Sequence, residues 1–193
     1  MSLQMRKSIF TAVIVVTGLG HHLASAEDVF EIDNSHTSTL FSVSHFNIGY
    51  IYGRFNTCSG KATMNQKEPE KSKFEFKIES KSIDTNDIGR DNHLRGPDFF
   101  DSENHPTIEF KSTAVKVNRG NYEVTGKFKM LDVEKDVTIP FQLLGVGKGP
   151  FGNTRMGMIA KFSIKRSEFG IEKMLDSIGD DVAITFSFEG VLK

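Results

Sequence analysis

Residues 90–110 read RDNHLRGPDFFDSENHPTIEF and differ in character from the sequence on either side. Both flanks alternate apolar and polar residues, as strands with one buried face do. This stretch instead gathers charged side chains around the adjacent pair Phe99 and Phe100. Its Gly-Pro pair ends any local helix, and the residue before Pro106 favours extended backbone, so a new strand is expected to begin there. We expect the stretch to fold back over a barrel or sheet, with both rings inside and its charges outside or paired. An ordinary loop whose two rings plug one end of the core is the alternative.

The rest of the chain indicates a succession of short strands, because apolar residues recur at every second position between turn signals. Asn118-Arg119-Gly120-Asn121 has the composition of a hairpin turn, and glycines mark another turn across 145–152. The expected strands cover residues 29–32, 39–46, 48–55, 74–79, 108–117, 122–130, 137–143, 156–164 and 182–188. About eight strands with short connections indicate an all-β fold, either an antiparallel barrel or a sandwich, in a single domain. Short helices are expected around 86–94, with Thr85 as a candidate N-cap, and around 171–177.

The interior of such a fold would consist largely of Phe and Met side chains, because the chain contains 17 Phe, 7 Met and no Trp. An eight-stranded barrel has just enough interior to be filled by side chains or to hold one small ligand. Large flexible apolar side chains serve either purpose. Composition therefore leaves both arrangements open, with a filled core as the default.

Residues 1–26 have the pattern of a secretory signal peptide. Arg6-Lys7 precede an apolar run over 9–19 that is too short to cross a bilayer, and Ala24-Ser25-Ala26 supplies the small residues needed for cleavage. We therefore expect this segment to be removed, leaving residues 27–193 as the folded domain of a periplasmic or secreted protein. An uncleaved membrane anchor is the alternative, and the short apolar run disfavours it.

The charges and the single cysteine exclude several classes of protein. Lys and Arg number 24 against 25 Asp and Glu, for a net charge of −1, and no basic block occurs. Nucleic acid is therefore not an expected partner. Cys58 is the only cysteine, so no disulfide within the chain supports the fold, which must rest on its core. We expect Cys58 itself to be a small core or strand residue.

Several short motifs occur in a fixed order along the chain. They are Asp33-x-x-His36, Phe41-x-Val43-x-His45, Gly53-x-Phe55, Ser82-Ile83-Asp84-Thr85, Arg90-Asp91-x-His93-Leu94-Arg95, Asp98-Phe99-Phe100-Asp101, Pro106-x-Ile108-x-Phe110, Val124-Thr125-Gly126 and Arg166-Ser167-x-Phe169-Gly170-Ile171. In combination they resemble the YceI-like family of bacterial secreted proteins over essentially all of residues 27–193. The resemblance implies an extended, lipocalin-like antiparallel barrel, a long apolar pocket for polyisoprenoids or similar amphiphiles, and no known reaction. True lipocalins usually place a Trp near the first strand, and this chain has none.

From this resemblance we expect a binding protein that holds an isoprenoid or similar amphiphilic lipid in an apolar barrel cavity, for transport or storage. We expect no enzymatic activity, no metal, and no cofactor apart from the bound lipid. An isoprenoid quinone, a polyprenyl lipid and a fatty-acid-like lipid are the candidate ligands, and transient membrane contact and a homodimer are candidate associations. The residues expected to contact the lipid are Phe41, Val43, His45, Phe99, Phe100, Phe110, Phe128, Met130, Ile139, Phe141, Met158, Phe162, Ile164, Ile184 and Phe186.

Three other functions compete with lipid binding. One is a filled-core barrel that acts as a surface interaction module. The second is a metal site, for which the sequence offers His36, His45, His93 and His105 with aspartates nearby. No paired-ligand spacing is present, and a lone His on an apolar strand face is more often a satisfied polar group. The third is a hydrolase, but none of the candidate nucleophiles lies in a catalytic motif: Ser35, Ser82 and Ser167.

Overall fold

The computed structural model describes residues 27–193, and the expected signal peptide at 1–26 lies outside the described residues. The described chain contains ten β-strands, one α-helix and three short 3-10 helices. The strands are β1 (Glu27–His45), β2 (Gly49–Phe55), β3 (Cys58–Asn65), β4 (Lys73–Glu79), β5 (Ile83–Asp84), β6 (Thr107–Asn118), β7 (Asn121–Met130), β8 (Val133–Lys148), β9 (Thr154–Lys165) and β10 (Ile178–Leu192). The helices are α1 (Ile88–Arg95), η1 (Pro69–Lys71), η2 (Ser80–Ser82) and η3 (Arg166–Phe169).

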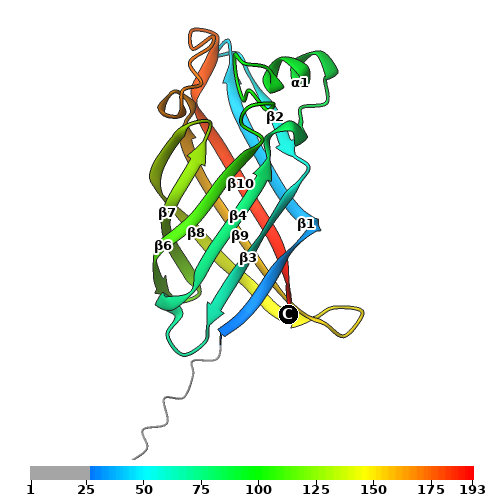
Figure 1. The fold of residues 1–193 in the computed structure, drawn as a ribbon, viewed down its shortest axis with the longest axis vertical. Helices are drawn as coiled ribbons and strands as arrows, with labels where there is room; N and C mark the ends of the chain where they lie inside the picture. Colours follow the sequence, from blue (N-terminus) through cyan, green and yellow to red (C-terminus); the bar gives the residue numbers. More distant parts are fainter. Residues whose placement is uncertain (1–26) are drawn as a thin grey trace, which may run out of the picture.

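The strands close into a barrel because the last strand pairs with the first. Neighbours are antiparallel in the order β10-β9-β8-β7-β6-β4-β3-β1, and β10 pairs with β1 from Phe30↔Leu192 to His45↔Ile178. These eight strands form the ring, and β2 and β5 extend it beside the later part of β1. Figure 1 shows an elongated barrel with tilted strands, with α1 at its upper end and the C-terminus at its lower end. The expected all-β, lipocalin-like antiparallel barrel is confirmed, and the sandwich alternative was wrong.

β1 spans the length of the barrel because it bends where the turn residues were expected to end it. Its pairing with β10 shifts register between Asp33 and Ser38. At the bend, where the strand pairing is interrupted, the side-chain amide of Asn34 makes hydrogen bonds to the backbone of the neighbouring segment. Its Oδ1 accepts from the N–H of Cys58 at 2.6 Å, and its Nδ2 donates to the carbonyl of Asn56 at 3.2 Å. Two segments expected to be separate strands are therefore one strand.

The bend also carries a carboxylate whose charge the fold stabilises. Asp33 accepts from the Ser35 hydroxyl at 2.6 Å, from His36 Nδ1 at 2.8 Å and from Arg155 Nη1 at 2.8 Å. These hydrogen bonds hold the pKa of Asp33 well below its usual range. A depressed pKa means that the stabilisation is complete above the unfolded-state pKa of about 4 and is lost as the pH falls below it.

We therefore expect Asp33→Asn to lower the free energy of unfolding by about 1–3 kcal/mol at neutral pH. The gap between parent and variant should narrow as the pH falls below about 4. Urea unfolding of the parent and the variant at a series of pH values measures this difference in free energy of unfolding. Asp136→Asn, at an exposed carboxylate paired with Lys127 at 3.0 Å, is the control and should change stability little. A gap for Asp33→Asn that stays constant from neutral to acid pH would contradict the expectation.

Strand β3 was not expected from the sequence. Residues 62–65 are all buried, so they lack the inside–outside alternation that marks a strand. The β3–β4 connection buries its end, where the N–H of Asn65 donates to the Ser72 hydroxyl at 3.1 Å. Cys58, at the start of β3, is buried as expected, and burial raises the pKa of its thiol to about 12.

Aromatic rings fill the lower half of the barrel. Phe74 and Phe141 stack with their centroids 5.5 Å apart, and Phe188 lies 6.1 Å from Phe141. All three side chains are at most 1% exposed. Because rings this closely packed leave no room between them, this half of the interior is a filled core.

Helix α1 is shorter than the helix expected over 86–94 and starts later. Its N-cap is Asp87 and not Thr85, because the Asp87 carboxylate accepts from the N–H of Arg90 at 2.8 Å. Residues 173–177 form turns, and no helix is present at 171–177 as had been expected. Among the described residues, no helix is long and apolar enough to cross a bilayer.

Candidate functional site

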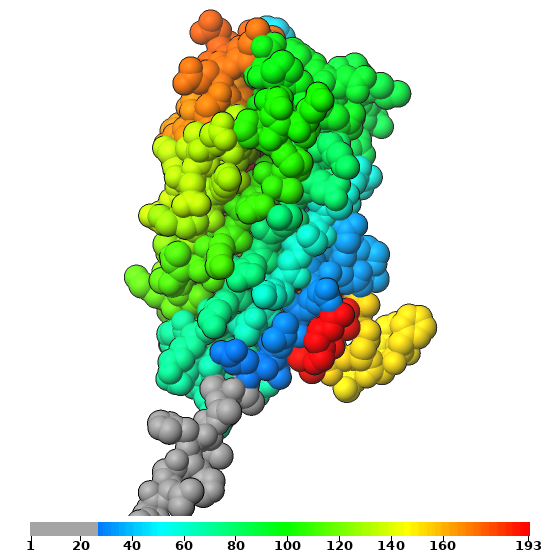
Figure 2. Space-filling view, viewed as in Figure 1, coloured from blue at the N-terminus to red at the C-terminus, as the bar shows by residue number. Residues whose placement is uncertain are grey.

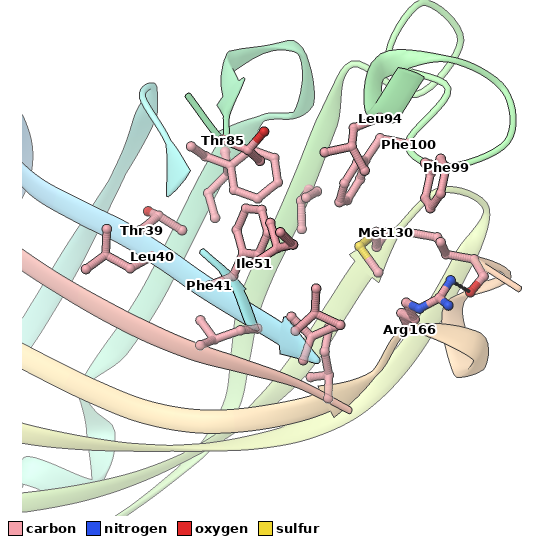
Figure 3. Close-up of a pocket in the computed structure, with 18 of the residues that line it drawn as sticks. Thr39, Leu40, Phe41, Ile51, Thr85, Leu94, Phe99, Phe100, Met130 and Arg166 are labelled. Atoms are coloured by element: carbon pink, nitrogen blue, oxygen red, sulfur yellow. Dashed lines mark hydrogen bonds between the residues drawn. The ribbon is translucent and has the colours of Figure 1, made fainter. Parts of the chain in front are cut away.

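The upper half of the barrel encloses a cavity of about 450 Å³. Residues from eight of the strands, from α1 and from the connections at the upper end line it, and most of them are apolar (Figure 3). The cavity lies above the packed rings of the lower half. The interior therefore combines the two arrangements that composition left open, a filled core and a ligand-sized space.

The stretch 90–101 closes part of the cavity wall. Phe99 is 6% exposed, and both Phe99 and Phe100 line the cavity. The ring of Phe100 meets the ring of Phe55 edge-on, with centroids 5.5 Å apart. The expectation that this stretch folds back over the barrel with both rings inside is confirmed.

Hydrogen bonds to β5 and Thr85 fasten this stretch to the barrel. The buried Asp91 carboxylate accepts from the N–H of Thr85 at 2.8 Å and from its hydroxyl at 2.5 Å. Arg90 donates to the carbonyl of Thr85 at 2.7 Å, and Arg95 donates to the carbonyl of Ile83 at 2.6 Å. Backbone carbonyls are therefore the main partners of both arginines, whereas the sequence predicted only that the charges of this stretch would lie outside or be paired.

Most of the residues expected to contact a lipid do line the cavity. They are Phe41, Val43, His45, Phe99, Phe100, Phe110, Phe128, Met130, Ile139, Phe162, Ile164, Ile184 and Phe186. Phe141 and Met158 do not, because they are 1% and 0% exposed within the packed core. Their placement on the cavity wall is corrected: strand alternation shows which side chains point inward but not how high they lie along the barrel. Contact of the wall residues with a lipid stays a prediction.

The sequence analysis missed other lining residues. Val182 alternates with the expected residues Ile184 and Phe186, and Ile108 with Phe110, so alternation could have found these two. Residues outside the strands, such as Leu94 in α1 and Met174 in the β9–β10 connection, carry no such signal. The missed residues are Thr39, Leu40, Ile51, Phe55, Phe76, Ile78, Thr85, Gly89, Arg90, His93, Leu94, Ile108, Arg166, Ile171, Met174, Ile178 and Val182.

One of the missed residues, Arg166, is a buried cation. Its side chain borders the cavity, and the residue is 5% exposed (Figure 3). Its Nε donates to Gly179, its Nη1 to Ile171 and Lys173, and its Nη2 to Ile178, all at carbonyl oxygens 2.8–3.0 Å away. Burial lowers the pKa of Arg166, although a guanidinium keeps its charge in proteins. The four bonds hold the β9–β10 connection across the upper end of the barrel.

The described histidines lie apart from one another, and three of them have aspartates nearby: His36, His93 and His105. His93 Nε2 is 3.2 Å from Asp98 Oδ2, and His105 Nε2 is 3.8 Å from Asp101 Oδ2. Across residues 27–193, no group of three or more His, Cys, Asp or Glu side chains is placed to hold a metal ion. The structure therefore offers no described side-chain cluster that favours the metal alternative.

Ser35, His36 and Asp33 lie together on the exposed bend of β1, but not as a catalytic relay. His36 Nδ1 is within hydrogen-bond distance of both the Ser35 hydroxyl, at 3.0 Å, and the Asp33 carboxylate, at 2.8 Å. A relay uses opposite ring nitrogens for the nucleophile and the carboxylate. The arrangement instead stabilises the bend.

The fold and the cavity together define a lipocalin-like barrel with an internal apolar site. The YceI-like domain matches residues 30–190. A UPF0312 protein of Pectobacterium atrosepticum is 35% identical, covering 94% of each chain. Another, of Pseudomonas paraeruginosa, is 34% identical and covers 98% of this chain and 95% of its own. The chain belongs to the YceI-like family.

Solved structures share the barrel. BcnA of Burkholderia cenocepacia superimposes with a TM-score of 0.74 at 22% identity, covering 82% of this chain and 98% of its own. The Campylobacter jejuni YceI protein gives 0.70 at 27% identity, with 78% and 90% covered. A domain of Saccharophagus degradans described as polyisoprenoid binding gives 0.68 at 13% identity, with 85% and 98% covered. At the lower identities these likenesses establish the fold alone.

Proposed function

We propose that the protein binds an isoprenoid or similar amphiphilic lipid in the upper cavity, in the periplasm or outside the cell, and carries or stores it without catalysing a reaction. The observation that carries this proposal is the apolar space of about 450 Å³ in an otherwise packed barrel. Protein interiors are normally close-packed, so a void of this size indicates a ligand site. The likeness to a polyisoprenoid-binding domain supports the choice of tail.

Selectivity in such a site comes from shape and from polar groups near the upper end. Burying a lipid tail gains roughly 0.8 kcal/mol per CH₂ relative to water, but almost nothing relative to a bilayer. His45, Arg90, His93 and Arg166 are the polar side chains with ionisable groups on the wall. We propose that they meet the head group of the lipid, whether it belongs to an isoprenoid quinone, a polyprenyl lipid or a fatty-acid-like lipid.

The most direct test is mass spectrometry of an organic extract of protein purified from its native source. We expect an isoprenoid or fatty amphiphile in near-stoichiometric amount. An extract with no lipid, from protein that also takes up no added polyprenol, would leave the filled-core interaction module as the better description.

The absence of Trp from the chain allows a second measurement. Phe162→Trp places a single Trp on the cavity wall, whereas Ser163→Trp places one at the neighbouring exposed position. After delipidation, added polyprenol should change the emission of Phe162→Trp saturably and leave that of Ser163→Trp unchanged. Equal responses at both positions would mean that the lipid does not enter the cavity.

A further inference from the structure

Exposed apolar side chains gather at the same end of the barrel as the cavity. Phe46 is 53% exposed, Ile48 89%, Ile88 81%, Met174 42% and Leu175 41%. We call these five residues the apolar rim. They come from three separate segments: the β1–β2 turn, the start of α1 and the β9–β10 connection. All three segments lie at the upper end in Figure 1.

The apolar rim is continuous with the cavity wall. Met174 belongs to both, and Gly89 and His93 of α1 also line the cavity while being exposed. The cavity therefore reaches the surface among these segments. Figure 2 shows the β9–β10 connection and the α1 segment forming the surface at this end.

Backbone geometry presents the tip of the β1–β2 turn to solvent. Phe46 and Asn47 have φ values of 50° and 55°, and the N–H of Ile48 donates to the carbonyl of His45 at 3.1 Å. Such a hairpin turn favours Asn and Gly at its central positions, so a Phe there adopts a conformation that L side chains rarely take. Phe46 is therefore both strained in its backbone and exposed in its side chain.

Polar contacts tie the segments of the apolar rim together. The N–H of Phe46 donates to the carbonyl of Ser177 at 2.6 Å, which joins the β1–β2 turn to the β9–β10 connection. Lys173 Nζ lies 3.2 Å from Asp98 Oδ2, which joins that connection to the stretch after α1. The three segments that carry the apolar rim are thus linked to one another around the opening of the cavity.

We propose that the apolar rim docks on the surface of a lipid bilayer, so that lipid passes directly between bilayer and cavity. This inference rests on the proposed function, because a bilayer is where a lipid ligand resides. A tail that crossed water would face a barrier that grows with each exposed methylene, and direct contact avoids it. Large apolar side chains beside the long cationic side chain of Lys173 suit the boundary between acyl chains and head groups.

Co-sedimentation of delipidated protein with phosphatidylcholine vesicles tests the docking. Ile48→Asp/Ile88→Asp removes two well-exposed apolar side chains, and Asp is compatible with the first turn of α1. The matched control is Val146→Asp/Phe151→Asp, at residues 57% and 91% exposed around the β8–β9 connection, which projects from the opposite end (Figure 2). We expect the rim variant to bind at least about tenfold more weakly than the parent, and the control to bind like the parent.

Equal binding by the rim variant and the parent overturns the docking inference, as does an equal loss in both double variants. A parent that sediments as a dimer and binds no vesicles, beside a monomeric rim variant, overturns it in favour of a second copy of the chain on the rim. The proposed function is scored separately, by the emission change of Phe162→Trp with added polyprenol. Uptake of polyprenol without vesicle binding therefore refutes the docking alone.

Discussion

Phe141→Ala is expected to lower the free energy of unfolding by about 3–5 kcal/mol, by the same amount with and without lipid. Phe141 is 1% exposed and stacks on Phe74, with the two rings 5° from parallel. Removing the ring leaves a void among packed neighbours that cannot collapse to fill it. The cost should not depend on lipid, because Phe141 lies outside the cavity wall.

Phe162→Ala should behave differently, because Phe162 is only partly buried and lines the cavity. One side of its ring already faces open space. In the absence of lipid, Phe162→Ala should therefore lower the free energy of unfolding by less than Phe141→Ala does. With lipid bound, the difference in free energy of unfolding between the parent and Phe162→Ala should be larger. A ligand that binds only the folded state adds stability by mass action, and the variant should bind the lipid more weakly.

Urea unfolding of the parent and both variants, each before and after delipidation, measures these effects. Phe141→Ala serves as the control for Phe162→Ala, because both remove a Phe ring from the same barrel. If Phe162→Ala costs as much as Phe141→Ala and delipidation changes neither, the upper half is a filled core and the lipid-binding proposal fails.

The second large effect is expected at Arg166. Arg166→Met removes the donor of four hydrogen bonds and takes this partner away from two carbonyls of the β9–β10 connection and two at the start of β10. Unsatisfied buried polar groups are costly, so we expect the free energy of unfolding to fall by about 3–5 kcal/mol. Lipid retention should fall as well, because Ile171 and Met174 of this connection and Ile178 at the start of β10 line the cavity.

Lys165→Met is the matched control for Arg166→Met. Lys165 is the preceding residue, and its exposed side chain pairs with Asp181 at 3.1 Å. A surface ion pair of this kind contributes about 1 kcal/mol or less, so this variant should unfold nearly as the parent does. If the two variants lose the same stability, the hydrogen bonds of Arg166 do not hold the upper end together.

The sequence by itself determined the strand faces and the class of fold. Alternation in segments such as 122–130 and 182–188 marks the inward residues, because successive side chains of a strand point to opposite sides of the sheet. Short connections made the neighbouring strands antiparallel, and the order of motifs identified the family. The adjacent rings of Phe99 and Phe100 in a charged stretch led to the expectation that this stretch covers the interior, with an ordinary loop as the alternative.

Only the tertiary structure decided where the interior is filled and where it is open. Phe141 and Phe162 have the same periodic pattern, yet one packs among rings and the other faces the cavity. Their heights along the barrel depend on strand register and tilt, which involve partners distant in the sequence. The role of Arg166 was hidden for the same reason. Its carbonyl acceptors gather around it only when the β9–β10 connection folds back over the end of the barrel.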